Sequence, residues 1–264
     1  YQPRMPLNAL RAAGFDAVVD FDDVKTYERF KLLADLQPGC VIGFNKQEYK
    51  LYDHSIPFLD SSSHISARYK AVARLFGIEH PHYHYHLPGD AFERERVKTL
   101  LAQQQGSELC IAINPFTAST DKDFCRHQVS ALIERLYTLP YKISVVMVGH
   151  SEKIRQLNLE TALHLPDSNI NSAVEIVRHC DLVITADTAI VHIARAFDKP
   201  MVAVYNKRKL KDTGLPGYTI WAPGYDKARQ IVCEETNVAD MTIDAVWPVI
   251  KAQADALIAA RQQA

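Results

Sequence analysis

The sequence has no long hydrophobic run, no paired cysteines and no excess of charge of either sign. No apolar stretch approaches the roughly 20 residues that cross a membrane. The net charge is −1, without a basic tail or stripe, which argues against a nucleic-acid partner. The five cysteines are scattered, with no CxxC pair, as in a cytosolic protein with reduced thiols. We therefore predict a cytoplasmic protein.

Glycine is also scarce, with ten residues in 264, and the glycine-rich phosphate-binding motifs are missing. There is no GxGxxG and no GxxxxGK[ST], and the second absence excludes a P-loop. The second half instead alternates short apolar runs with helical periodicity. Strands are predicted over 109–113, 143–148, 182–185 and 201–205, and helices over 124–137, 174–179 and 189–197. This alternation predicts βαβ units and a parallel sheet.

The first hundred residues have a weaker pattern. Strands are predicted over 15–21 and 40–44, helices over 7–13, 64–76 and 90–105, and a polar irregular segment over 46–63. Because the regular alternation of predicted strands and helices begins after Gly106, we expect two domains, 1–105 and 106–264. The chain opens at Tyr1 rather than at a methionine, so we expect the first domain to lack its beginning. The amphipathic stretch 243–260 is expected to form a helix that packs back on the first domain.

The most informative stretch runs from Asp181 to Tyr205. A strand ends there in a short polar turn with Asp187 and Thr188, and a helix follows. The free N–H groups at a helix start form a ready anion site. His192 lies four residues after Thr188, so the two share a helix face. This pattern predicts a phosphate-bearing ligand, and the alternative is that Asp187 or Thr188 only caps the helix.

Two further loops follow strands of the same half. The loop 114–124 contains hydroxyl donors, including Thr117 and Ser119, and the point charge of Lys122, which suits phosphate. A plain polar loop with an exposed lysine is the alternative. Gly149 ends the strand over 143–148, and Glu152 lies just beyond it. Its carboxylate can accept hydrogen bonds from ribose hydroxyls, or it can simply favour the first turn of a helix.

Two other patterns raise the question of a metal. Asp20-Phe21-Asp22 is a DxD sequence, and two such carboxylates can share a hard cation. The run His80-Pro-His82-Tyr-His84-Tyr-His86 alternates with period two, so the imidazoles would line one face of a strand and could bind zinc or copper. Acids at a strand end and a wet histidine-rich edge are the alternatives, and we predict no metal.

The order and spacing of these motifs resemble glycosyltransferase family 9, the bacterial heptosyltransferases, which have the GT-B fold. The family's Asp-Thr-Gly-x-x-His corresponds to Asp187-Thr188-Ala189-Ile190-Val191-His192, with alanine in place of the usual glycine. Its proline-led loop and its Gly-x-x-Glu correspond to Pro115, Lys122 and Phe124, and to Gly149 and Glu152. Further matches are Ala194, Ala196, Pro200, Pro223, Gly224 and Cys233. The resemblance covers residues 105–250 and is loose before them, where it depends on the stretch from Phe15 to Asp20.

The resemblance implies an α/β protein of the GT-B type, with two Rossmann-like domains facing a cleft. It implies transfer of a heptose from a nucleotide-heptose, most simply ADP-heptose, to the inner core of lipopolysaccharide. No metal or other cofactor is implied, because a lysine and helix N-termini can stabilise the leaving diphosphate. The lipid acceptor implies peripheral contact with the inner membrane.

The resemblance also assigns roles to residues. Lys122 and Asp187 become the catalytic candidates. The donor-binding candidates are Thr117, Ser119, Lys122, Glu152, Asp187, Thr188, Ala189 and His192. The base that activates the acceptor precedes Tyr1 or is Asp20 or Asp22. Three alternatives stay open: a metal-dependent GT-A enzyme that uses Asp20 and Asp22, a nucleotide-sugar epimerase, and a non-catalytic nucleotide-sugar-binding homologue.

Overall fold

The computed structural model describes residues 6–58, 63–80, 84–104, 106–210 and 214–263. The chain forms two compact units. The first comprises Tyr1–His82 and Lys209–Ile220, and the second comprises Tyr83–Arg208 and Trp221–Ala264. The boundary between the two units therefore precedes the helix that we predicted over 90–105. The later segment Lys209–Ile220 belongs to the first unit.

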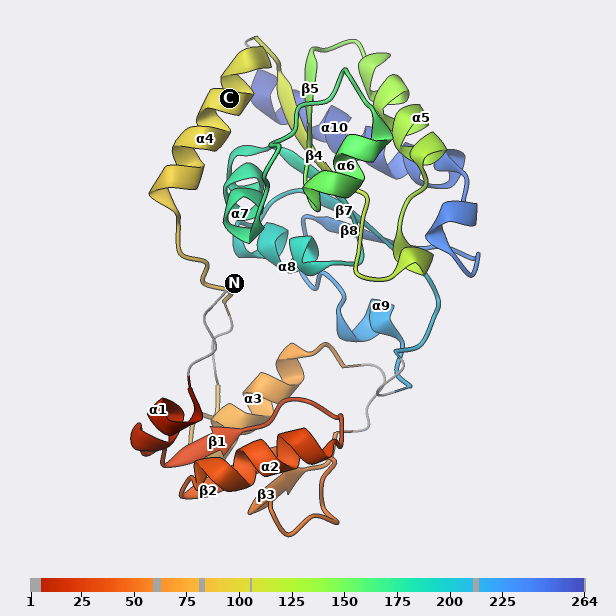
Figure 1. Ribbon diagram of the computed structural model, residues 1–264. Coiled ribbons are helices and arrows are strands. Elements are labelled where there is room, and N and C mark those ends of the chain that lie inside the picture. The colour runs from red at the N-terminus through yellow and green to blue at the C-terminus, as the bar shows by residue number, and fades with distance from the viewer. Residues whose placement is uncertain (1–5, 59–62, 81–83, 105, 211–213, 264) are drawn as a thin grey trace. The chain divides into compact units, whose positions relative to one another are not determined.

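The first unit is built on a three-stranded parallel sheet of order β1-β2-β3 (Figure 1). Its elements are α1 (Leu7–Ala12), β1 (Ala17–Val19), α2 (Tyr27–Leu36), β2 (Cys40–Phe44), β3 (His54–Ile56), α3 (Ser66–Leu75) and α9 (Gly217–Ile220). Leu33, Val41 and Tyr52 form its small core. At Gly43 a β-carbon would lie 2.5 Å from the Tyr52 ring, so the packing of this core requires glycine there.

The second unit contains a five-stranded parallel sheet of order β5-β4-β6-β7-β8. Its strands are β4 (Leu109–Asn114), β5 (Ile143–Met147), β6 (Leu182–Ala186), β7 (Met201–Tyr205) and β8 (Ala228–Val232). Strands β5, β6 and β7 are buried along their whole length, and β4 at all but one residue. Continuous apolar runs of this kind are typical of parallel strands that are covered on both faces.

Helices cover both faces of this sheet (Figure 1). One group comprises α4 (Ala91–Leu101), α7 (Ile170–His179) and α8 (Ala189–Ala196), in which α7 packs against both α4 and α8. The other comprises α5 (Arg126–Tyr137) and α10 (Ile243–Gln262), which contact each other, and α10 also contacts β6 and β7. Helix α6 (Ser151–Leu157) follows β5. The resulting core is large and almost entirely aliphatic.

The strands and helices predicted for the second half are confirmed, with shifted ends. Helix α7 begins four residues before the predicted 174–179, because Asn169 caps it. Among the described residues, the helices α2, α6 and α9 and the strands β3 and β8 were not predicted. The irregular segment predicted over 46–63 is wrong in part, because His54–Ile56 pairs with β2 as β3. These elements are short or partly exposed, so their periodicity is weak.

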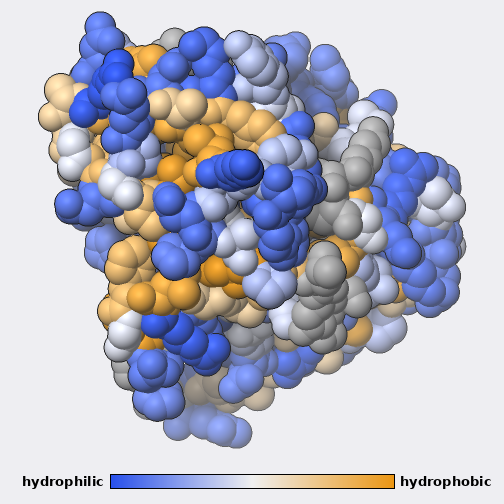
Figure 2. All heavy atoms as spheres, turned by 90° about the horizontal axis from the view of Figure 1, so that it is seen from below, coloured by the Kyte–Doolittle hydropathy of each residue, from blue (hydrophilic) through white to orange (hydrophobic). Residues whose placement is uncertain are grey.

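Among the described residues, no helix is both long and apolar enough to cross a bilayer. On the face drawn in Figure 2, apolar residues form patches that are bordered and interrupted by hydrophilic ones. Large exposed apolar side chains include Tyr27, Phe76 and Phe92.

Candidate functional site

A cavity of about 300 Å³ opens at the carboxyl ends of the central strands of the second unit. Strand β4 lies between β5 and β6, so the chain moves to opposite sides of β4 at this place. Ligands of open α/β sheets bind at such a switch point. The cavity is lined by Asn114 after β4, by Gly149 and His150 after β5, by Thr188, Ala189 and Ile190 after β6, and by Ser168, Asn169, Ile170 and Ala173 at the start of α7.

Two helix N-termini contribute to this cavity. The Asn169 side chain caps α7 by accepting hydrogen bonds from the N–H groups of Asn171 and Ser172, at 2.8 and 3.0 Å. The Thr188 hydroxyl caps α8 by accepting a hydrogen bond from the N–H of Ile190 at 3.1 Å. Thr188 is thus a capping residue and also lines the cavity. The partial positive charge of both helix starts favours an anion here.

Lys122 is brought to the same turn by a long-range contact. It ends a short 3₁₀ turn, Thr120–Lys122, and its Nζ donates a hydrogen bond to Oδ2 of Asp187 at 2.6 Å. Both side chains are largely buried, with exposed fractions of 20% and 9%. The structure therefore unites two loops that the sequence places 65 residues apart, and it puts a cation beside the start of α8.

The 3₁₀ turn is held from the end of β7. The buried Asn206 follows this strand, and its Nδ2 donates hydrogen bonds to the carbonyl and to Oδ2 of Asp121, at 3.2 and 2.9 Å. Burial of Asp121 raises its pKa, but hydrogen bonds from Ser119 and Asn206 outweigh that effect, so the pKa is lowered overall. Asp121 is therefore an anionic anchor of the turn.

The start of the loop is tied down in a similar way. The Thr117 hydroxyl donates a hydrogen bond to the Ser119 carbonyl at 2.7 Å and accepts one from the Ser119 N–H at 2.9 Å. Lys153 donates to Oδ2 of Asp123 at 2.9 Å and to the Thr117 carbonyl at 3.3 Å. Thr117 and Ser119 thus shape the loop, and neither lines the cavity.

The other predicted donor-binding residues that lie outside the cavity lining are Lys122, Asp187, His192 and Glu152, so Thr188 and Ala189 are the predicted ones that line it. The Nδ1 of His192 lies 3.0 Å from the Tyr85 hydroxyl, and the ring packs edge-on against Trp221. Thr188 and His192 therefore do not converge on the one cavity. Glu152 is exposed on α6 and pairs with Arg155 of the same helix at 2.6 Å. Its predecessors Gly149 and His150 are the residues that reach the cavity.

The DxD carboxylates of the first unit are already paired with cations. Asp20 accepts hydrogen bonds from Arg29 at 2.9 Å, Lys46 at 3.3 Å and Tyr52 at 2.8 Å. Its side chain is 1% exposed, and Lys46 is fully buried. Asp22 accepts a hydrogen bond from Arg29 at 2.5 Å. A buried carboxylate with three side-chain donors has a structural role at the end of β1, which argues against Asp20 as a metal ligand or as an accessible base.

The histidine run is only partly visible, because His82 lies outside the described residues. Among the residues described, no group of three or more histidine, cysteine, aspartate or glutamate side chains is arranged to hold a metal ion.

Some residues at the site were not predicted from the sequence. Asn114 immediately follows the apolar run of β4, and Asn169 immediately precedes α7. An asparagine at a helix start is itself a capping signal. Asn206 follows the apolar strand β7 at the same end of the sheet. A rule that collects polar residues after each parallel strand would have found Asn114 and Asn206.

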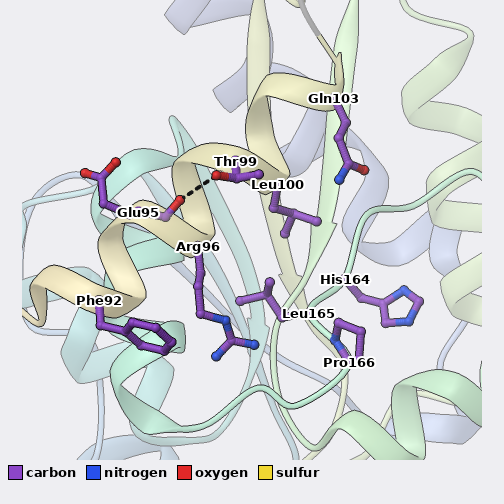
Figure 3. A pocket seen from close by; sticks show the side chains of 9 residues that line it. All are labelled: Phe92, Glu95, Arg96, Thr99, Leu100, Gln103, His164, Leu165 and Pro166. Atoms are coloured by element: carbon purple, nitrogen blue, oxygen red, sulfur yellow. Dashed lines mark hydrogen bonds between the residues drawn. The ribbon is translucent and has the colours of Figure 1, made fainter.

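A larger groove, of about 530 Å³, lies between α4 and the segment His164–Pro166 (Figure 3). Figure 3 shows Phe92, Leu100, Leu165 and Pro166 among its lining, with Arg96 beside Phe92. The guanidinium of Arg96 is already paired with Glu93 at 3.0 Å. None of the predicted site residues lines this groove.

The fold places this chain among GT-B-type glycosyltransferase structures. The structure of Escherichia coli ADP-heptose lipopolysaccharide heptosyltransferase II is similar to it, with a TM-score of 0.72 and 17% sequence identity. The match covers 97% of this chain and 80% of that chain. A glycosyltransferase family 9 protein from Veillonella parvula gives a TM-score of 0.71 and 14% identity, with coverage of 98% of this chain and 80% of that one. Escherichia coli heptosyltransferase WaaC, solved with ADP, gives a TM-score of 0.61 and 19% identity, with coverage of 94% of this chain and 76% of that one.

Comparison of the amino-acid sequence with family models identifies the family of this chain. Residues 7–244 match the model of glycosyltransferase family 9 (heptosyltransferase), and the chain belongs to this family. It is also 25% identical over 250 residues to a protein of Escherichia coli (strain K12) provisionally named lipopolysaccharide heptosyltransferase 4. That match covers 92% of this chain and 67% of the relative. The chain is therefore a glycosyltransferase, and the resemblance inferred from the motifs is confirmed.

Proposed function

We propose that this protein transfers a heptose from ADP-heptose to the inner core of lipopolysaccharide. The observation that carries the proposal is the cavity at the switch point, onto which the N-termini of α7 and α8 open. Lys122 does not line this cavity, but it pairs with Asp187, the residue just before the cap of α8. The names of the similar proteins support the choice of donor and acceptor, because they include an ADP-heptose lipopolysaccharide heptosyltransferase and a heptosyltransferase solved with ADP.

The cavity suits a nucleoside joined to a diphosphate. Ile170, Ala173 and Ile190 give it an apolar wall against which a base can pack. The N–H groups at the start of α8 and the ammonium of Lys122 provide positive potential for the diphosphate. In this proposal Thr188 and Ala189 contact the phosphates through the backbone at the helix start.

The same groups promote the reaction. When an acceptor hydroxyl attacks the anomeric carbon, its proton passes to a general base, the bond from that carbon to the diphosphate oxygen breaks, and the leaving diphosphate gains negative charge. Donors that are fixed before the reaction stabilise this charge without reorganisation. Lys122 is the proposed main donor. Asp187 orients the Lys122 ammonium in the free protein and is proposed to contact the sugar when the donor is bound.

The other predicted donor-binding residues receive supporting roles. Thr117 and Ser119 hold the loop that carries Lys122, and His192 fixes α8 through Tyr85. We propose that Glu152 approaches the ribose only when the donor is bound, since in the structure it pairs with Arg155. Asp20 and Asp22 hold Arg29 and are not proposed as the base. The reaction is proposed to occur in the cytoplasm, with peripheral contact to the inner membrane where the lipid acceptor lies.

Binding and transfer assays test this proposal. Calorimetric titration of the purified chain with ADP, UDP and GDP should show that ADP binds most tightly. Incubation with ADP-heptose and a lipopolysaccharide that lacks inner-core heptose should add one heptose to the acceptor, as read by mass spectrometry. The rate should be the same with and without EDTA.

Each alternative gives a different result. Loss of transfer in EDTA would favour a metal-dependent enzyme, and conversion of the donor without acceptor would favour an epimerase. Tight ADP binding without any transfer would favour a nucleotide-sugar-binding homologue. Absence of both binding and transfer would refute the proposal.

A further inference from the structure

Asn114 contains a buried acceptor that has no partner. This residue is the last of β4 and is 4% exposed, and its Oδ1 has no hydrogen-bond partner in the structure. A buried polar atom without a partner costs about 1–3 kcal/mol of stability. Such atoms are rare in folded proteins and call for an explanation.

The place of Asn114 gives that explanation. It lines the 300 Å³ cavity at the switch point. The neighbouring polar side chains already have partners there: the Ser168 hydroxyl donates to the Gly149 carbonyl at 2.6 Å, and the Thr188 hydroxyl caps α8. Asn114 thus lines the cavity, and its Oδ1 is a buried acceptor that lacks a partner in the free protein.

Gly149 keeps space beside this amide. Its φ of +129° lies in a region that favours glycine, and a β-carbon on it would lie 3.5 Å from Asn114 Nδ2. The Ser168 hydroxyl holds the Gly149 carbonyl, which fixes this part of the cavity wall. This hydrogen bond orders the wall beside Asn114, and a group that distinguishes ligands by a hydrogen bond needs such support.

We propose that Asn114 Oδ1 accepts a hydrogen bond from the nucleoside part of the donor and so helps to select it. This rests on the proposed function, since it assumes a nucleoside diphosphate in the cavity. Phosphate oxygens at neutral pH accept and do not donate, so they cannot satisfy this atom. The donors on the nucleoside part of the ligand are the ribose hydroxyls and the exocyclic amine of the base. A site built to bond such a group discriminates strongly against analogues that lack it.

The test compares Asn114→Ala with Asn171→Ala, which removes an exposed asparagine of α7 that does not line the cavity. Asn114→Ala should weaken ADP binding by about 10-fold, as expected for one hydrogen bond. It should leave pyrophosphate binding unchanged and should not lower the melting temperature of the free protein, because no existing hydrogen bond is lost. Asn171→Ala should bind ADP like the wild type.

Analogues identify the group on the ligand. The wild type should lose about the same 10-fold for one of 2′-deoxy-ADP, 3′-deoxy-ADP and inosine diphosphate, and Asn114→Ala should show no further loss for that analogue. The proposal is overturned if the wild type binds all three analogues as tightly as ADP, whether or not the variant folds. It is also overturned if Asn114→Ala binds ADP normally. If the wild type binds no nucleoside diphosphate at all, the proposed function itself fails.

Discussion

The Nζ atom of Lys122 lies 2.6 Å from Oδ2 of Asp187, although the two residues are 65 positions apart. The contact joins the loop after β4 to the turn after β6, which are neighbouring strands. In the free protein the carboxylate neutralises the cation and keeps it ordered. If the proposed donor site is right, a bound diphosphate competes with Asp187 for the same ammonium, and the pair then links the state of the turn to the presence of the donor.

Removing the cation should impair both binding and catalysis. Lys122→Ala is expected to raise the Kd for ADP and to lower kcat by about 100-fold, corresponding to about 3 kcal/mol of lost transition-state stabilisation. Lys251→Ala is a control, because Lys251 is exposed on α10 and pairs with Asp255 of the same helix. Calorimetry and the transfer assay measure the two effects. If Lys122→Ala changes neither value, Lys122 has no part in the site.

Removing the opposite charge should separate binding from turnover. Asp187→Asn leaves Lys122 without its anion, so ADP should bind more tightly or equally well, because the ammonium is free to meet the phosphates. Turnover should fall if Asp187 orients the sugar. The measurements are the Kd for ADP and kcat for heptose transfer. A large loss of ADP affinity would contradict the competition between Asp187 and the diphosphate for Lys122.

Asn206 should act through the turn that carries Lys122. Asn206→Ala deletes both hydrogen bonds to Asp121, and we expect a several-fold loss of ADP affinity together with a loss of about 1–3 kcal/mol of stability. Asn206→Asp should be at least as damaging, because it sets a second carboxylate beside Asp121. In Lys122→Ala the substitution at Asn206 should cause no further loss of affinity. Additive losses would mean that Asn206 acts separately from Lys122.

The cap of α8 should be measurable as well. Thr188→Ala removes the acceptor of the Ile190 N–H, which should cost about 1 kcal/mol of unfolding free energy. Thr188→Ser keeps the hydroxyl and should retain most of that stability. Urea unfolding compares the variants, and ADP titration shows whether the cap also matters for binding. Equal stability of the alanine and serine variants would show that the hydroxyl makes no net contribution.

The lowered pKa of Asp121 predicts a pH dependence of stability. A carboxylate whose folded pKa lies below its ordinary value of 3.8 contributes stability that is present above that value and is lost as the pH falls through the folded pKa. The destabilisation caused by Asp121→Asn should therefore be present at pH 7 and shrink below about pH 3.8. Urea unfolding at several pH values measures it. A difference that grows toward acid pH would be the wrong sign.

Local sequence determined the elements and their motifs. The apolar runs 109–113, 182–185 and 201–205 could form little other than buried parallel strands, and the Asp187-Thr188 pair at the next helix start indicated both a cap and an anion site. These signals need only periodicity and the chemistry of adjacent residues.

Tertiary structure decided which of these groups meet. The strand order β5-β4-β6 sets the ends of β4 and β6 side by side, and this joins Lys122 to Asp187 and places Asn114, Gly149 and Thr188 around one cavity. The same packing turned His192 toward Tyr85 and left Glu152 in solvent. Periodicity reports which face of an element is buried. The neighbour that covers it depends on crossovers between distant strands, so these contacts were settled only when the whole sheet had formed.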